Sequence, residues 1–222
     1  MKLVIISDTH GHHEALGTLS GDVLIHCGDM ESLFNKDVCA IANMDNWFGR
    51  QQFDHVLCTG GNHDLAIEQQ IRLGNHQPFR NATFLNDAGL TLDGVKFYGA
   101  PWVPDLAHHA FYADDAALKV AWSKIPNDVD VLLTHTPPAG MLDVSSRGLT
   151  LGCPHLRKRL GALRPTVHCF GHVHASAGQR KHRGVTYINA TSVDSSFEIA
   201  HPPYVIEVSQ RTVRSTSKSW WG

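Results

Sequence analysis

The sequence predicts an α/β protein built as a four-layer α/β/β/α sandwich with two mixed β-sheets. Short apolar runs recur up to residue 170, each ending in a polar cluster, and helical periodicities lie between several of them. In the last third, strand-like runs follow one another without helices. Helical crossovers join parallel strands, whereas direct connections join antiparallel ones. We therefore expect two packed sheets of mixed direction with helices on the outside.

Five apolar, β-branched runs are typical of strands buried on both faces. They cover residues 3–6, 23–25, 56–58, 129–133 and 166–170. The polar clusters that follow are, in chain order, SDTHG, HCGD, TGGNHD, THTPP and GHVH. Each cluster falls at the carboxyl end of its strand, where open α/β sheets bind ligands.

Apolar residues spaced by three and four predict helices over residues 38–48, 118–125 and 154–163. Pro126 ends the second of these helices and Pro154 opens the third. In the third helix, Arg157, Lys158 and Arg159 point away from the leucine stripe. This basic triplet is expected to be a solvated helix face.

The last third is expected to hold strands over residues 185–189, 204–208 and 212–215 that form a β-meander. The tail ending in Trp220 and Trp221 is expected to pack on the body of the protein, with a subunit contact as the alternative. No linker or internal repeat interrupts the chain, so residues 1–222 are expected to form a single domain.

The composition disfavours several classes of protein. With 19 Lys and Arg against 21 Asp and Glu, the net charge is −2, which argues against a nucleic-acid polymer as partner. No apolar run approaches the ~20 residues of a membrane span, and the first one is too short for a signal peptide. The five cysteines are odd in number, form no C-x-x-C pair and are expected to be reduced and mostly buried. We therefore expect a cytoplasmic protein without a membrane partner.

Taken together, the polar clusters offer the ligands of a two-metal site. Two divalent ions about 3.5–4 Å apart need a carboxylate between them, with imidazole, amide and carboxylate ligands around them. The D-x-H and H-x-H pairs each point to one side of an extended segment, and a glycine before each of three ligands permits close backbone approach. The candidate ligands are Asp8, His10, Asp29, Asn62, His135, His172 and His174.

Charge counting indicates the substrate. Two divalent ions, two carboxylates and a bridging hydroxide leave the site at about +1, which attracts a small anion such as phosphate. Mixed nitrogen and oxygen ligation suits Mn²⁺, Fe, Zn²⁺, Co²⁺ or Ni²⁺, of which Mn²⁺ is the first expectation.

The motifs D-x-H, G-D, G-N-H-D, H and G-H-x-H stand in the order found in the calcineurin-like metallophosphoesterase superfamily, which the chain resembles from Asp8 to His174. The segments YGAPW, THTPP and YINAT, with Gly152-Cys153 and Pro202-Pro203, are similar to its metallophosphoesterase-domain-containing branch, which is related to class III cyclic nucleotide phosphodiesterases. Some animal members of that branch lack the first histidine of G-H-x-H. This sequence keeps His172, so the resemblance implies a complete site.

The resemblance also implies a role for each motif residue. Asp8, His10 and His174 would bind the first metal and Asn62, His135 and His172 the second, with Asp29 bridging the two. A hydroxide that bridges the metals would attack phosphorus. His63 would protonate the leaving oxygen, and Asp64 would orient His63.

The expected function is hydrolysis of a small phosphodiester, such as a 2′,3′- or 3′,5′-cyclic nucleotide. A phosphomonoesterase acting on a small phosphate or a phosphoprotein is the alternative, because it uses the same site. A nuclease is disfavoured by the net charge, and a non-catalytic scaffold by the complete set of ligands. Either a monomer or a homodimer fits the sequence.

Further residues beside the motifs are candidates for substrate contact. Two histidines follow the D-x-H turn, two follow G-A-P-W, and one arginine lies in the loop before the third helix. The alternatives without a function are that the histidines after D-x-H begin a short helix and that the arginine is an ordinary surface charge. These candidates are His12, His13, His108, His109 and Arg147. His26 is instead expected to be buried and hydrogen-bonded.

Overall fold

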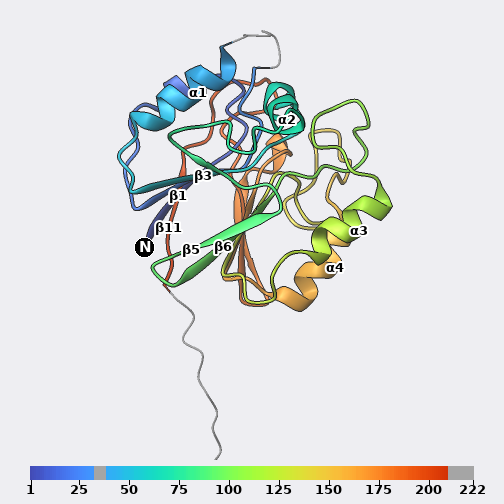
Figure 1. Ribbon diagram of the computed structural model, residues 1–222. Coiled ribbons are helices and arrows are strands. Elements are labelled where there is room, and N and C mark those ends of the chain that lie inside the picture. Colours follow the sequence, from blue (N-terminus) through green and yellow to red (C-terminus); the bar gives the residue numbers. More distant parts are fainter. Residues whose placement is uncertain (33–38, 210–222) are drawn as a thin grey trace, which may run out of the picture.

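The computed structural model describes residues 1–32 and 39–209 and has two mixed β-sheets with helices on their outer sides (Figure 1). The first sheet has the order β11-β1-β2-β3-β4. Its strands are β1 (Lys2–Ile6), β2 (Val23–His26), β3 (His55–Cys58), β4 (Thr83–Phe84) and β11 (Tyr204–Glu207). The second sheet has the order β5-β6-β7-β8-β10-β9. Its strands are β5 (Ala88–Leu92), β6 (Val95–Ala100), β7 (Val131–Thr134), β8 (Val167–Phe170), β9 (Gly178–His182) and β10 (Val185–Asn189). The expected fold class is confirmed.

Each sheet has a parallel centre; the first sheet has one antiparallel edge strand and the second has two. Strands β1 to β4 run parallel and so do β6, β7, β8 and β10, whereas β11, β5 and β9 are antiparallel to their neighbours. The predicted β-meander is wrong. Strand β10 lies parallel to β8, and β11 crosses to the other sheet beside β1. Burial explains this division, because β10 is largely buried whereas β11 alternates half-buried and exposed residues, which suits an edge.

The helices α1 (Ala40–Gly49), α2 (Leu65–Arg72), α3 (Asp115–Ser123) and α4 (Pro154–Leu163) flank the sheets. Helices α1 and α2 lie beside the first sheet and α3 and α4 beside the second (Figure 1). The three predicted helices are confirmed as α1, α3 and α4, although Val38 falls outside the described residues. The predicted strand over residues 212–215 and the tail with Trp220 and Trp221 also lie outside them. The sequence pattern missed α2, whose apolar face buries only Ile67. Over residues 1–32 and 39–209, every helix is too short or too polar to cross a membrane.

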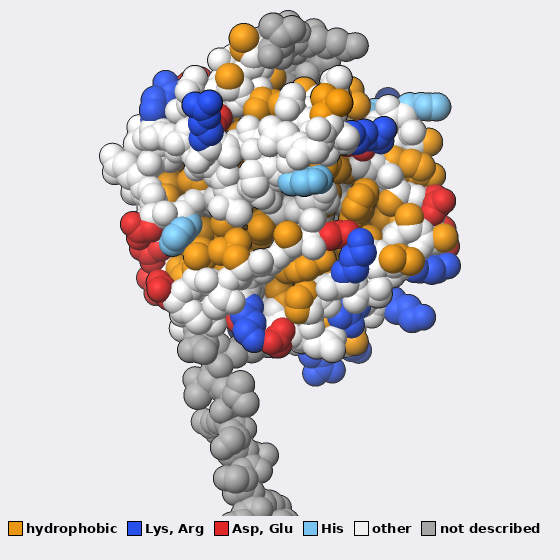
Figure 2. Space-filling view, in the orientation of Figure 1, with side chains coloured by type: hydrophobic (Ala, Val, Ile, Leu, Met, Phe, Trp, Pro, Cys, Tyr) orange, Lys and Arg blue, Asp and Glu red, His pale blue; other side chains and the backbone are white. Residues whose placement is uncertain are grey.

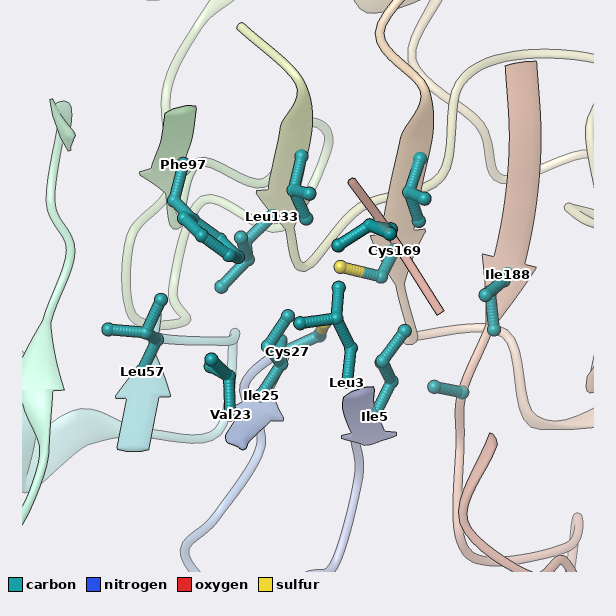
Figure 3. Close-up of a cluster of buried hydrophobic side chains, with 14 of the residues drawn as sticks. Leu3, Ile5, Val23, Ile25, Cys27, Leu57, Phe97, Leu133, Cys169 and Ile188 are labelled. Atoms are coloured by element: carbon teal, nitrogen blue, oxygen red, sulfur yellow. The ribbon is translucent and has the colours of Figure 1, made fainter. Parts of the chain in front are cut away.

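The main core lies between the two sheets (Figure 3). Alternate residues of β1 and β2, such as Leu3 and Ile25, face Phe97, Leu133 and Cys169 of the second sheet. Their sequence neighbours point outward and are buried beneath the helices. Both faces of the central strands are therefore apolar, which explains why these strands appear in the sequence as continuous apolar runs.

The buried thiols and one buried histidine agree with expectation. Cys27, Cys58, Cys153 and Cys169 are free thiols and buried, whereas Cys39 is exposed. The ring of His26 is buried, and its Nε2 and the Thr9 hydroxyl are hydrogen-bonded at 3.0 Å.

The stability of the fold should depend on pH through His168 on β8. This ring is fully buried, and burial lowers its pKa from 6.5 to about 3. As pH falls below 6.5 the unfolded chain takes up a proton that the folded chain does not, so stability decreases. The loss attributable to His168 between pH 7 and pH 5 is about 2 kcal/mol. Urea unfolding at both pH values should show that His168→Gln loses less stability between pH 7 and pH 5 than the wild type does, by this amount. Equal losses in the two proteins would contradict the prediction.

Candidate metal centre and active site

The predicted ligands lie on five loops at the carboxyl ends of β1, β2, β3, β7 and β8, which the two sheets bring to one edge. Five of the seven side chains are buried and two are half-buried. Two groups have ligand atoms within 4.8 Å of one another: Asp8, His10 and His174, and Asp8, Asp29 and His135. The site therefore assembles from residues spread over most of the chain.

The backbone turns sharply at four of these residues. Asp8, His10, Asp29 and His172 have φ values of 52°, 44°, 56° and 70°, in the left-handed region. The expectation that D-x-H is extended is therefore wrong. The segment curves over the β2 loop instead, where Asp8 N–H donates to the Gly28 carbonyl at 2.9 Å. Left-handed backbone costs an L-residue roughly 1–2 kcal/mol, and such strain clusters at functional sites.

Ring nitrogens and carboxylate oxygens converge in the first group. Nε2 of His10 lies 3.3 Å from Nε2 of His174, which in turn lies 3.5 Å from Oδ1 of Asp8. Two imidazole lone pairs and a carboxylate that face one another suit a divalent cation between them. The residues therefore fit the metal that the sequence predicts.

The second half of the site is centred on Asn62 and Asp29. Oδ1 of Asn62 lies 3.0 Å from Nε2 of His135 and 2.8 Å from Nδ1 of His172. Oδ2 of Asp29 lies 3.4 Å from Nε2 of His135 and 3.9 Å from Nε2 of His10, so it stands between the two halves. Asp8 belongs to both ligand groups, which makes it a second shared carboxylate.

Two glycines permit this close assembly. A Cβ at Gly171 would lie 2.0 Å from Oδ2 of Asp8, and one at Gly61 would lie 2.3 Å from Oδ1 of Asp29. Real side chains do not approach so closely, so any other residue would displace a carboxylate. The predicted need for glycine before Asn62 and His172 has this physical cause.

Charges inside the site hold its carboxylates ionised. Burial raises the pKa of Asp29, but the neighbouring rings of His135, His10 and His63 outweigh burial and keep the pKa well below its usual value. Burial lowers the pKa of His135, yet the charge and hydrogen bond of Asp29 raise it to about 9. A metal ion must displace that proton from His135, so metal affinity should rise with pH.

His63 lies at the mouth of the site. Its Nε2 is 3.9 Å from Oδ2 of Asp29, its side chain is 28 % exposed, and it belongs to neither ligand group. Burial lowers its pKa and the charge of Asp29 opposes this. The ring lines a pocket of about 240 Å³ together with several candidate ligands. A ring nitrogen beside the metals but outside their ligand groups is positioned for proton transfer.

Asp64 has a different position from the one expected. Its carboxylate is buried and accepts N–H bonds at 2.8–3.0 Å from residues 29, 30, 31 and 61. These bonds hold the loop that carries Asp29, whereas no hydrogen bond to the His63 ring is formed among the described residues. Asp29 itself anchors His63, because its Oδ1 accepts the His63 N–H at 2.8 Å. Asp64 is therefore placed as a positioning residue for Asp29.

This placement makes Asp64→Asn a test of two roles. Loss of one acceptor oxygen should loosen the Asp29 loop and weaken metal affinity about 10–100-fold, as is usual for groups that support metal ligands. The remaining activity at saturating metal should be lowered equally for good and poor leaving groups. Metal titrations and rates on a nitrophenyl and an alkyl ester measure both. A loss confined to the alkyl ester at unchanged metal affinity would instead show that Asp64 acts through His63.

The candidates for substrate contact divide into three groups. The exposed ring of His109 packs edge-on against His63, with 5.5 Å between centroids. His12 and His13 line a separate cavity of about 440 Å³ that reaches His10. His108 and Arg147 are exposed and line neither the pocket at His63 nor this cavity.

Sequence reasoning missed part of the pocket wall. Phe197 packs its ring against His10 and His174, at centroid distances of 5.3 and 5.0 Å, and Ser145, Ser146 and Ser195 also line the pocket. These residues lie in irregular loops without a motif. In the sequence, Ser145 and Ser146 are linked to the site only because they lie in the loop that begins with THTPP.

Comparisons with known proteins show which family and fold the chain shares. The profile of the calcineurin-like phosphoesterase family matches residues 1–176. The chain is 33% identical to UPF0046 protein K07C11.7 of Caenorhabditis elegans, over 96% of this chain and 77% of that protein. It is 29% identical to human metallophosphoesterase domain-containing protein 1, over 93% of this chain and 71% of that protein. The crystal structure of TT1561 of Thermus thermophilus shares the fold, with a TM-score of 0.55, 15% identity, and coverage of 87% of this chain and 89% of that one.

The family implies divalent metal ions, and the two ligand groups at the carboxyl ends of the strands are where this chain can hold them. The matched region contains all seven predicted ligands together with His63. The chain belongs to the calcineurin-like phosphoesterase family.

Proposed function

We propose that the protein is a dinuclear-metal-dependent phosphodiesterase that hydrolyses a small phosphodiester, such as a 2′,3′- or 3′,5′-cyclic nucleotide. The observation that carries the proposal is the pair of ligand groups that share Asp8, with His63 beside both of them and open to a pocket. Bound metal ions would supply Lewis-acid stabilisation of the charge that develops on the phosphoryl group. Mn²⁺ is the first metal to test, followed by Fe, Zn²⁺, Co²⁺ and Ni²⁺.

The chain's own residues divide the remaining work. Asp29 and Asp8 contribute the carboxylate oxygens that lie between the two halves of the site, and Asn62 contributes an amide oxygen to the second half. His63 donates a proton from Nε2 to the leaving oxygen, because its ring reaches the pocket without belonging to a ligand group. Phe197 packs against both histidines of the first group and helps to hold their rings in place.

The pocket wall favours a diester over a monoester. The described residues that line it include serine hydroxyls and apolar groups such as Leu151 and Phe197, and neither lysine nor arginine is among them. A monoester dianion gains more from cationic side chains than a diester monoanion does. A volume of about 240 Å³ also favours a small substrate over a polymer or a phosphoprotein.

One panel of substrates tests the proposal. Metal-reconstituted protein is assayed against bis-nitrophenyl phosphate, nitrophenyl phosphate, and adenosine 2′,3′- and 3′,5′-cyclic phosphates. We expect the highest kcat/KM on diesters. A preference for nitrophenyl phosphate would favour the phosphomonoesterase, and no turnover with any metal would favour a non-catalytic scaffold.

A further inference from the structure

The basic triplet of α4 does not form one solvated face. Arg159 donates to the carbonyls of Trp122 and Ile125 and so joins α4 to the end of α3. Lys158 is exposed. Arg157 turns toward the β9–β10 hairpin and lines a small pocket there. In Figure 2, Lys and Arg side chains gather over the region that α3 and α4 occupy in Figure 1.

This pocket is strongly basic. Its lining includes Arg157, Arg164, His182, Arg183 and Tyr187, and no Asp or Glu within residues 1–32 and 39–209 lines it. Its volume is about 40 Å³, which is room for about three water molecules. Arg164 precedes β8 whereas the metal centre follows it, so the pocket lies at the opposite end of the strand from the active site.

One guanidinium nitrogen in this pocket lacks a partner. Nη1 of Arg157 is buried and makes no hydrogen bond to any described residue. A buried donor on a charged group is costly when it is unpaired, and an oxyanion is the ligand that arginine donors match best. Burial and the charges of Arg157, Arg183 and Arg180 lower the pKa of His182, which shows how closely the positive charges crowd together.

Two of the arginines also have an unfavourable backbone conformation. Arg164 ends α4 with φ of 50°, and Arg183 opens the hairpin turn with φ of 49°. Glycine or asparagine occupies such positions at lower cost, and an L-residue there costs about 1–2 kcal/mol. Local backbone preference therefore does not account for arginine at either position, whereas a shared anionic ligand would.

We propose that the pocket formed by Arg157, Arg164, His182 and Arg183 binds a small phosphate-type oxyanion, separately from the metal centre. Paired arginine donors match the oxygens of phosphate in geometry and charge. The volume accommodates a single phosphate group and excludes a nucleoside from the pocket itself. The ligand is therefore inorganic phosphate or the terminal phosphate of a phosphomonoester, bound through the same contacts.

Calorimetric titration of the metal-free, full-length chain tests this proposal at constant ionic strength. Inorganic phosphate should bind with a stoichiometry of one, and Arg157→Gln and Arg183→Asn should each weaken binding about tenfold. Asparagine suits the left-handed backbone at residue 183, so this variant should fold normally. Lys158→Gln is the matched control, because it removes one α4 charge outside the pocket and should bind phosphate as the wild type does.

A second measurement locates the ligand. Phosphate should slow the reaction of Arg183 with phenylglyoxal, as mapped by mass spectrometry, and leave that of Arg147 unchanged. A parallel titration with glycerol 3-phosphate identifies the source, since tighter binding than inorganic phosphate indicates an ester and weaker binding indicates the free ion. Absence of saturable binding, equal binding by Arg157→Gln, or equal weakening by Lys158→Gln would overturn the proposal. Loss of phosphoesterase activity leaves it standing, because the titration uses no metal.

Discussion

Replacing Asp29 with alanine is expected to remove metal and activity together, with kcat/KM falling at least about 10³-fold. Asp29 is buried, and its Oδ2 faces the ring nitrogens of His10, His63 and His135 at 3.4–3.9 Å. Its Oδ1 also accepts the backbone N–H of His63 at 2.8 Å. The substitution therefore removes a predicted shared metal ligand. It also removes the hydrogen bond that anchors the backbone of His63, the proposed acid.

Metal content by mass spectrometry and kcat/KM on bis-nitrophenyl phosphate measure these effects, with circular dichroism to verify folding. Asp54→Ala is the matched control, because Asp54 is exposed just before β3 and takes no part in the site. Full metal content in Asp29→Ala would contradict the role of Asp29 in metal binding.

Replacing His63 with alanine is expected to produce a loss that depends on the leaving group. Alkoxide leaving groups need a proton, so their esters should lose about 10²–10⁴-fold in rate. Nitrophenolate leaves without one, so nitrophenyl esters should lose far less. Because the protonated ring is the acid, the wild-type rate on alkyl esters should fall as pH rises through the pKa of His63, and the variant should lack this limb.

Rates on a matched series of nitrophenyl and alkyl diesters across pH 5–9 measure the effect at saturating metal. His76→Ala, which removes an exposed histidine that belongs to neither ligand group and does not line the pocket, should follow the wild type on every ester. Equal losses on both ester classes in His63→Ala would rule out the proton-donor role.

The positions of the central strands and of the metal ligands follow from local sequence patterns. Strands β1, β2, β7 and β8 are buried on both faces and β3 is buried in its second half, so they appear as apolar runs whose ends are marked by polar residues. Since parallel strands end at one edge, side chains that follow them converge without any knowledge of pairing. That is why ligands as far apart in the chain as Asp8 and His174 could be predicted together.

Strand pairing and contacts between distant segments were not predictable in this way. Strand β11 alternates half-buried and exposed residues, and its sequence contains nothing that indicates pairing with β1 rather than β10. Phe197 reaches His10 only because the chain after β10 crosses from one sheet to the other.

The residue sequence thus predicted the fold class, the candidate metal ligands and the need for glycine beside them, since each depends on local pattern and residue type. Folding in three dimensions established which groups Asp64 holds, which side chains line the pocket, and where the basic triplet of α4 points. These are contacts between segments distant in the chain. Their partners are selected by how the two sheets pack and where the loops turn, and no spacing along the sequence encodes that choice.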